Sequence, residues 1–170
     1  MRRTISILTI ALCVFSFSGA AHAAKHKSAR SGDDANIKFI KQAYAYMDYG
    51  WTSMDVNRMT TYTTDDCHFT AGGETVDKHN YQVLTYNEMI RLYPKATAVG
   101  MQTTTRSDIT SLSEQGPYIT INRTLTVHMS TADRTANVYC YFRDVWVRQA
   151  KGWFIQDEQQ KAFVLGKNTQ

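Results

Sequence analysis

Two acids and one arginine interrupt otherwise apolar strands, and these side chains are the best suited to chemistry. Asp144 and Asp157 occupy the two arms of a predicted β-hairpin, Phe142–Gln159, and Arg123 interrupts the apolar face of the preceding strand. A carboxyl group removed from water keeps its proton to a higher pH, whereas a nearby guanidinium favours the charged form. Two carboxyls beside an arginine therefore suit proton transfer, with one acid as donor and the other as acceptor.

Strand register decides whether these three side chains meet. The segment Tyr118–Met129 alternates between apolar and polar residues, and Arg123 is the intruder on its apolar face. A tight turn after this strand sets Arg123 opposite Phe142, and the following turn sets Asp144 opposite Asp157. Directly opposed side chains lie about 5 Å apart and share a face of the sheet. We therefore expect an inward cluster of Arg123, Asp144 and Asp157, with Asp144 and Asp157 as the catalytic candidates.

A purely structural interpretation fits the same three residues. Arg123 and Asp144 can form a buried ion pair that fixes the strand register, while Asp157 lies at a solvent-exposed rim. The sequence leaves both interpretations open.

Five further side chains are candidates for binding a ligand. Tyr44 faces inward on the first predicted helix and can donate a hydrogen bond, and Tyr62 lies on the inner face of a second, short helix. Phe142 and Trp146 share the inward face of their strand, although Trp146 also suits a packed core. His68 begins a strand and can enter the hollow, the alternative being a partly exposed residue after an acidic turn.

The chain places helices first and strands later. Apolar residues at three- and four-residue steps predict the first helix, and a third helix is expected from Asn80 to Tyr93, ended by Pro94. A small hairpin surrounds Gly72-Gly73. Four long strands follow, at Ala98–Ser113, Tyr118–Ser130, Thr135–Arg148 and Trp153–Val164. Short turns join them, so we expect an α+β domain whose three N-terminal helices pack in the concave face of a strongly curved, mostly antiparallel sheet.

The N-terminus predicts export. Two arginines precede an apolar run that is too short to span a bilayer, and Ala21-His22-Ala23 fits a cleavage site. An N-terminal membrane anchor is the alternative. We expect a periplasmic or extracellular protein divided into a signal peptide (1–23), a disordered tail (24–34), one domain (35–165) and a C-terminal tail (166–170).

Composition excludes several classes of partner. The net charge is +4, and loss of the leader, with two arginines and no acid, lowers it to +2. No basic stripe with interleaved aromatics predicts nucleic-acid binding, and no later segment is apolar enough to cross a membrane. The histidines are scattered, so we expect neither metal nor cofactor. Cys67 and Cys140 are either two buried thiols or one disulfide.

Two segments carry a resemblance to the nuclear transport factor 2-like superfamily, whose fold is a cystatin-like cone. TYTTDDCHF, Thr61–Phe69, resembles the point where the second helix of that fold ends in a paired-acid turn and the first strand begins. RDVWVRQAKGWFI, Arg143–Ile155, resembles the late hairpin of SnoaL-like domains. The resemblance covers residues 35–164.

The resemblance also bears on catalysis. Asp144 matches the neutral acid of ketosteroid isomerase, a protein whose carboxylic acid keeps its proton in an apolar site. The general base of that enzyme falls at Ala71, which cannot accept a proton, so steroid isomerisation is not expected. Asp157 falls where many SnoaL-like domains carry a histidine or an acid. The polar groups of limonene epoxide hydrolase and scytalone dehydratase have no clear match.

Three functions follow from these observations. The first is an exported SnoaL-like domain that binds a small, largely apolar or aromatic molecule in a conical pocket. The second is a cofactor-free isomerase, cyclase or dehydratase that uses a carboxylate pair as acid and base. The third is an oligomerisation or partner-binding module, such as a homodimer through the outer sheet face.

Overall fold

The computed structural model describes residues 34–166, so the predicted signal peptide and both tails lie almost entirely outside the described residues. The helical elements are α2 (Asp34–Ser53), α3 (Val56–Met59) and α4 (Lys78–Ala98). The strands are β1 (Thr63–Ala71), β2 (Glu74–Asp77), β3 (Gln102–Gln115), β4 (Tyr118–Ser130), β5 (Thr135–Gln149) and β6 (Gly152–Leu165).

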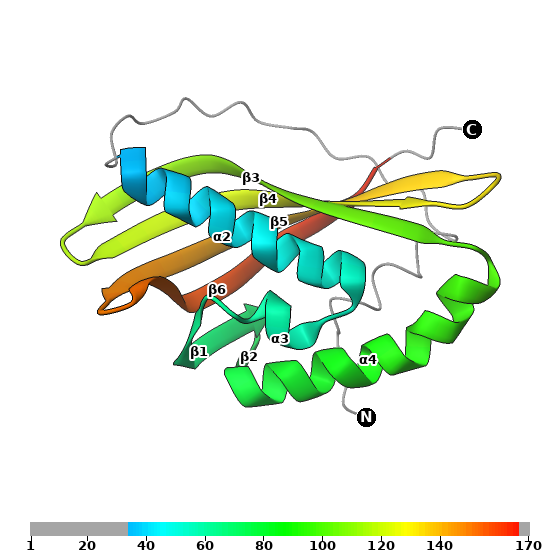
Figure 1. The fold of residues 1–170 in the computed structure, drawn as a ribbon, viewed down its shortest axis with the longest axis horizontal. Helices are drawn as coiled ribbons and strands as arrows, with labels where there is room; N and C mark the ends of the chain where they lie inside the picture. Colours follow the sequence, from blue (N-terminus) through cyan, green and yellow to red (C-terminus); the bar gives the residue numbers. More distant parts are fainter. Residues whose placement is uncertain (1–33, 167–170) are drawn as a thin grey trace.

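The strands form one curved sheet with the order β2-β1-β6-β5-β4-β3. Neighbours are antiparallel except β1 and β6, which are parallel and join the first strand of the chain to the last. In Figure 1, α2 crosses one face of the long strands. The helix α4 runs alongside β1 and β2 and extends past these two strands. The predicted α+β architecture, with helices packed on a curved, mostly antiparallel sheet, is confirmed.

The helix α4 is longer than its sequence predicts. It continues through Pro94 to Ala98, whereas the prediction ended it at Tyr93. Leu92 and Ala96 lie four residues apart on its buried face, so packing across the last turn maintains the helix beyond the proline. Of the apolar side chains of α4, Leu92 is buried, whereas Val83, Leu84 and Ile90 are exposed.

The strand register agrees with prediction on one side of β5 and differs on the other. Arg123 pairs with Phe142 as expected. The expected pairing of Asp144 with Asp157 is wrong, because Asp144 pairs with Glu158. Trp146 pairs with Ile155, whereas the preceding residue of β5 pairs with Asp157, so Gln156 is an extra residue in β6. This β-bulge turns the next side chains of β6, including Asp157 and Glu158, to the opposite face, and a second irregularity between Gln160 and Ala162 shifts the register again.

Close contact between α2 and α3 fixes the position of Met59. Gly50 lies so near α3 that a Cβ atom there would come within 2.8 Å of the Met59 backbone nitrogen. Only glycine allows this approach without displacement of the backbone. The contact places Met59 in a small apolar cluster with Val56 and Met89.

Two sequence expectations about cysteine and membranes can be compared with the described residues. Cys67 and Cys140 are both buried free thiols, so the disulfide alternative is wrong. Within residues 34–166, the helices lack the combination of length and apolar character that a bilayer span requires.

Candidate functional site

A buried ionic network lies where β4, β5 and β6 face α2. The Arg123 Nε donates a hydrogen bond to Asp144 Oδ2 at 2.7 Å, and its Nη2 donates to Glu158 Oε2 at 2.8 Å. These side chains are at most 8% exposed. The guanidinium also lies 4.8 Å from the Tyr44 ring centroid and 4.3 Å from that of Phe142. Paired charges and aromatic contacts together make it possible for an arginine to remain charged in this interior.

Tyr44 links the helix α2 to this network. Its hydroxyl donates to Asp144 Oδ2 at 2.6 Å and accepts a hydrogen bond from Trp146 Nε1 at 2.8 Å. The ring of Tyr44 meets the Trp146 ring edge-on, with 5.2 Å between centroids. Asp144 is fully buried, and its second oxygen, Oδ1, has no hydrogen-bond partner among the described residues. Asp144 therefore accepts two strong hydrogen bonds on one oxygen and leaves the other free.

A second acid reaches the network from α2. Asp48 lies one helical turn after Tyr44, and its carboxylate accepts hydrogen bonds from the Ser107 backbone nitrogen at 2.6 Å and the Ser107 hydroxyl at 2.9 Å. The same hydroxyl oxygen lies 3.1 Å from Arg123 Nη1, from which it accepts a hydrogen bond. Three buried carboxyls thus surround one guanidinium.

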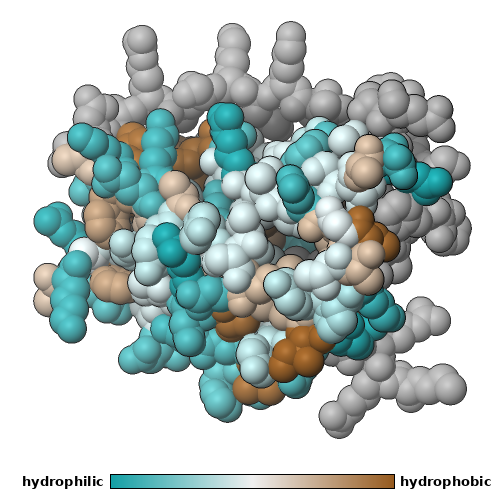
Figure 2. All heavy atoms as spheres, turned by 45° about the vertical axis from the view of Figure 1, so that its right-hand side comes forward, coloured by the Kyte–Doolittle hydropathy of each residue, from teal (hydrophilic) through white to brown (hydrophobic). Residues whose placement is uncertain are grey.

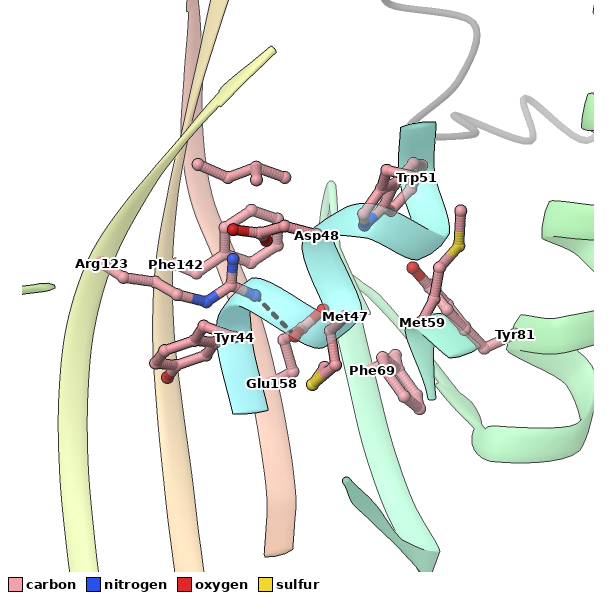
Figure 3. A pocket seen from close by; sticks show the side chains of 11 residues that line it. Tyr44, Met47, Asp48, Trp51, Met59, Phe69, Tyr81, Arg123, Phe142 and Glu158 are labelled. Atoms are coloured by element: carbon pink, nitrogen blue, oxygen red, sulfur yellow. Dashed lines mark hydrogen bonds and ion pairs between the residues drawn. The ribbon is translucent and has the colours of Figure 1, made fainter. Parts of the chain in front are cut away.

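A small cavity lies between this network and the helices (Figure 3). Arg123 and Phe142 form its sheet side, and Trp51, Met59 and Tyr81 lie on the opposite side. The remaining lining residues are Tyr44, Met47, Asp48, Phe69, Leu125 and Glu158. The space left among them is about 10 Å³, which is close to the minimum that one water molecule needs. Side chains therefore fill nearly all of the cone in this state.

Burial governs the electrostatics of the cavity. It raises the pKa of Glu158 from 4.5 to about 7, because the loss of solvation outweighs the attraction of Arg123. Burial likewise raises the pKa of Asp48, against the opposing effects of Arg123 and Ser107. Loss of solvation opposes the charge of Arg123, yet Asp144 and Glu158 outweigh it and raise the arginine pKa. Burial and the neighbouring Asp144 raise the pKa of the Tyr44 hydroxyl, which stays a donor.

The structure brings together only part of the predicted site. Tyr44, Arg123 and Phe142 line the cavity, as expected for ligand-binding candidates. Asp144 and Trp146 are fully buried behind Tyr44, so they support the cavity wall without lining it.

Three other candidates lie elsewhere. Asp157 faces away from the cavity because of the bulge in β6, and its carboxylate is 3.9 Å from Arg143 on the outer face. His68 pairs with Asp157 across the parallel β1–β6 ladder and is exposed. Tyr62 packs edge-on against Phe39, with 5.7 Å between ring centroids, and lies outside the cavity lining. The expectation that Asp157 points into the cone is therefore wrong, and His68 follows the exposed alternative.

Two functional candidates were missed from the sequence. Glu158, which the predicted register turns outward as the neighbour of Asp157, is 6% exposed and lines the cavity. The bulge at Gln156 has no simple signal in the sequence, because a hairpin continued without interruption puts Asp157 inward. Asp48 had a usable signal: it lies four residues after Tyr44, and residues at this spacing share a helix face.

The arrangement has two chemical capabilities. Glu158 can accept a hydrogen bond from a molecule in the cavity, or exchange a proton with it near neutral pH. Arg123 can stabilise a developing negative charge, although two carboxylates already occupy its donors. Within residues 34–166, there is no group of three or more histidine, cysteine or acidic side chains that could hold a metal ion.

Comparison with known proteins identifies the fold. No protein-family model and no curated protein sequence matches the chain. Among solved structures, it is similar to an NTF2-like protein with a cystatin-like fold from Novosphingobium aromaticivorans (TM-score 0.59, 15% identity, 74% of this chain and 80% of that one). It is also similar to Aln2 from a Streptomyces species (TM-score 0.63, 15% identity, 81% and 94%).

A third similar structure, a protein from Catenulispora acidiphila, is in complex with S-DNPA (TM-score 0.58, 19% identity, 75% of this chain and 95% of that one). At these identities the likeness shows the fold and leaves the activity open. The predicted nuclear transport factor 2-like, cystatin-like fold is therefore confirmed.

Proposed function

We propose that this chain, whose fold is that of nuclear transport factor 2-like proteins, is an exported domain that binds a small molecule within its cone. The ligand has a largely apolar body and one group that donates a hydrogen bond to Glu158. The observation that carries the proposal is the position of Glu158, a nearly buried carboxyl on the wall of a cavity that is otherwise rich in aromatic and methionine side chains.

Ligand entry requires the helical side of the cavity to move. About 10 Å³ of free space admits no organic molecule, so the cavity must widen before one can bind. Met47 and Met59 line the cavity, and methionine side chains adapt to irregular shapes at low cost. The short helix α3 holds Met59 against Gly50, so a small shift of α3 opens the cavity away from the ionic network.

The similar protein from Catenulispora acidiphila supports a binding function for this fold, because that protein is in complex with S-DNPA. A SnoaL-like binding domain therefore agrees with both the fold and the cavity wall.

Matched small aromatic probes test the proposal by calorimetry and thermal unfolding. Benzylamine and benzyl alcohol both present a donor on an apolar body, whereas toluene lacks the donor. We expect the first two to bind and raise the unfolding temperature, and toluene to bind more weakly. Replacement of Glu158 by glutamine should weaken benzylamine binding about tenfold or more, because a hydrogen bond to a charged group contributes about 1.5–3 kcal/mol.

The control is Asp157→Asn, which alters the neighbouring acid on the outer face and should leave binding unchanged. Met59→Ala provides a second readout, since a shorter side chain enlarges the cavity and should favour binding of all three probes. Failure of every probe to bind both the unmodified chain and Met59→Ala would overturn the proposal.

A second candidate function is acid–base catalysis without a cofactor. The observation in its favour is the pKa of Glu158, raised by burial to about 7, which lets this carboxyl accept and return a proton near neutral pH. The working acid would be Glu158, in place of Asp157, with Arg123 stabilising negative charge on the substrate.

Hydrogen exchange of a simple ketone tests this alternative. In heavy water, Glu158 would remove a proton from the carbon next to the carbonyl of cyclohexanone and return a deuteron to the enolate. Proton NMR would show faster loss of that signal with the protein than with Glu158→Gln, and Asp157→Asn would behave like the unmodified chain. Equal rates for all three proteins would exclude this role for Glu158.

A further inference from the structure

The helix α4 has two apolar faces, only one of which is covered. Its buried side chains, Tyr81, Thr85, Met89, Leu92 and Ala96, pack on the body of the domain. A second set is exposed, with Val83 at 44%, Tyr86 at 56%, Ile90 at 55% and Tyr93 at 53%. We call these four residues the outer stripe of α4. Figure 2 shows hydrophobic side chains along the lower edge of the molecule, where α4 lies in Figure 1.

The spacing of the outer stripe is that of a helix-pairing surface. Its members are three, four and three residues apart, which repeats the alternating steps of a heptad along more than two turns. Thr97 is also exposed and follows Tyr93 by four residues, so it lies on the same face of the helix. None of these positions carries a charge. A face of this width and regularity fits one other helix better than an irregular surface.

We propose that α4 is a dimerisation helix, whose outer stripe packs antiparallel against the outer stripe of a second copy. In an isologous pair, each residue of one copy contacts the symmetry-related set of the other. A twofold axis near Ile90 brings the two Ile90 side chains together and places Val83 of each copy near Thr97 of the other.

The area and composition of the surface favour a second copy as the occupant. Each stripe residue leaves about half of its side chain in solvent, on the order of 100 Å². Two copies paired along the stripe and its flanks bury on the order of 1,000 Å², which is near the lower limit for a specific interface. The pairing should therefore be weak and dependent on concentration.

Competing occupants and surfaces fit less well. Residues 24–33 and 167–170 of the chain are mostly polar or charged, so they offer few apolar side chains to cover the stripe. Residues 83–99 contain six of the eleven large hydrophobic side chains that are exposed in residues 34–166. The outer sheet face, through which the sequence also allowed a dimer, contributes Tyr118 and Tyr141.

Sedimentation velocity of the chain without residues 1–23, measured over a wide range of concentration, tests the proposal. We expect a monomer–dimer equilibrium that Ile90→Glu weakens more than tenfold, because two buried carboxylates would face each other across the axis. Leu84→Glu is the matched control: it makes the same chemical change at an exposed position of α4 outside the outer stripe, and should leave the equilibrium unchanged. Circular dichroism checks that each variant is folded.

Oxidative cross-linking provides a readout that needs no destabilising charge. Ile90→Cys should form a disulfide between two copies near the axis, whereas Lys95→Cys, exposed on another side of α4, should not. Three results would overturn the proposal: a monomer at all concentrations, a dimer that Tyr141→Glu dissociates and Ile90→Glu does not, or equal cross-linking of the two cysteine variants. Flotation with lipid vesicles that depends on Ile90 in a monomeric protein would assign the stripe to a membrane surface instead, and would also overturn it.

Discussion

The two faces of the curved sheet carry ion pairs of the same length in opposite surroundings. On the inner face, Arg123 lies 2.7 Å from Asp144, and both side chains are at most 5% exposed. On the outer face, Arg106 lies 2.7 Å from Asp108, with exposed fractions of 78% and 51%. Judged by distance alone, the two ion pairs would contribute equally to stability. Water screens the outer pair, whereas the inner charges depend on each other because little solvent can replace a lost partner.

The largest expected effect comes from breaking the inner pair. Asp144→Ala leaves Arg123 without its shortest ionic contact and Tyr44 without an acceptor, so we expect a loss of about 3–5 kcal/mol in the free energy of unfolding. Urea denaturation measures this loss. Asp157→Ala, at a carboxylate 3.9 Å from Arg143, should cost less than about 1 kcal/mol. Similar losses in the two variants would show that burial does not separate the two faces.

The next effect is a dependence of stability on pH. The unfolded chain releases the Glu158 proton near pH 4.5, whereas the folded chain retains it to about pH 7. The folded state thus binds more protons in this pH window. The resulting stabilisation of the folded state by Glu158 is fully present below about pH 4.5 and is lost as the pH rises to about 7. The loss is at most about 3 kcal/mol.

Denaturation of the unmodified chain and of Glu158→Gln across this window checks the assignment. The glutamine variant should show a flatter dependence, although Asp48, whose pKa is also raised, leaves a residual slope of the same sign. A slope that is unchanged in Glu158→Gln would mean that Glu158 titrates as an ordinary surface acid.

A smaller effect is expected from the tyrosine that joins α2 to the network. Tyr44→Phe removes the hydrogen bond to Asp144 and the acceptor of Trp146 while retaining the ring, so we expect a loss of about 2 kcal/mol. Tyr46→Phe is the control, since Tyr46 is 40% exposed and its hydroxyl makes no hydrogen bond within residues 34–166. Thermal unfolding compares the two, and equal losses would contradict the role given to Tyr44.

The smallest effect is expected on the outer face. Asp108→Asn breaks the 2.7 Å contact with Arg106 but should change stability by no more than about 0.5 kcal/mol, because both groups are hydrated. Any effect should vanish at high salt. A loss comparable to that of Asp144→Ala would remove the distinction between the faces.

Local patterns predicted much of the inner face correctly. Arg123 interrupts a strict apolar alternation, and the short turn after β4 fixes its pairing with Phe142. Tyr44 follows from the apolar spacing of α2. These signals depend on periodicity and turn length, which are local properties of the chain.

Two features could not be derived in this way. Glu158 faces the cavity in place of Asp157 because β6 contains one extra residue. The position of that residue depends on how β5 and β6 pack along their whole length. The exposed second face of α4 required knowing which side of that helix the domain covers, because both sides are apolar in the sequence.

The sequence by itself therefore determined the order of helices and strands, the curved antiparallel sheet and the inward direction of Arg123 and Asp144, because alternation and turns act over a few residues. Only the tertiary structure decided that Glu158 completes the ionic network, that the cone is almost full, and that α4 presents its outer stripe to solvent. These properties depend on register, side-chain volume and burial, which arise when segments distant in the chain come together.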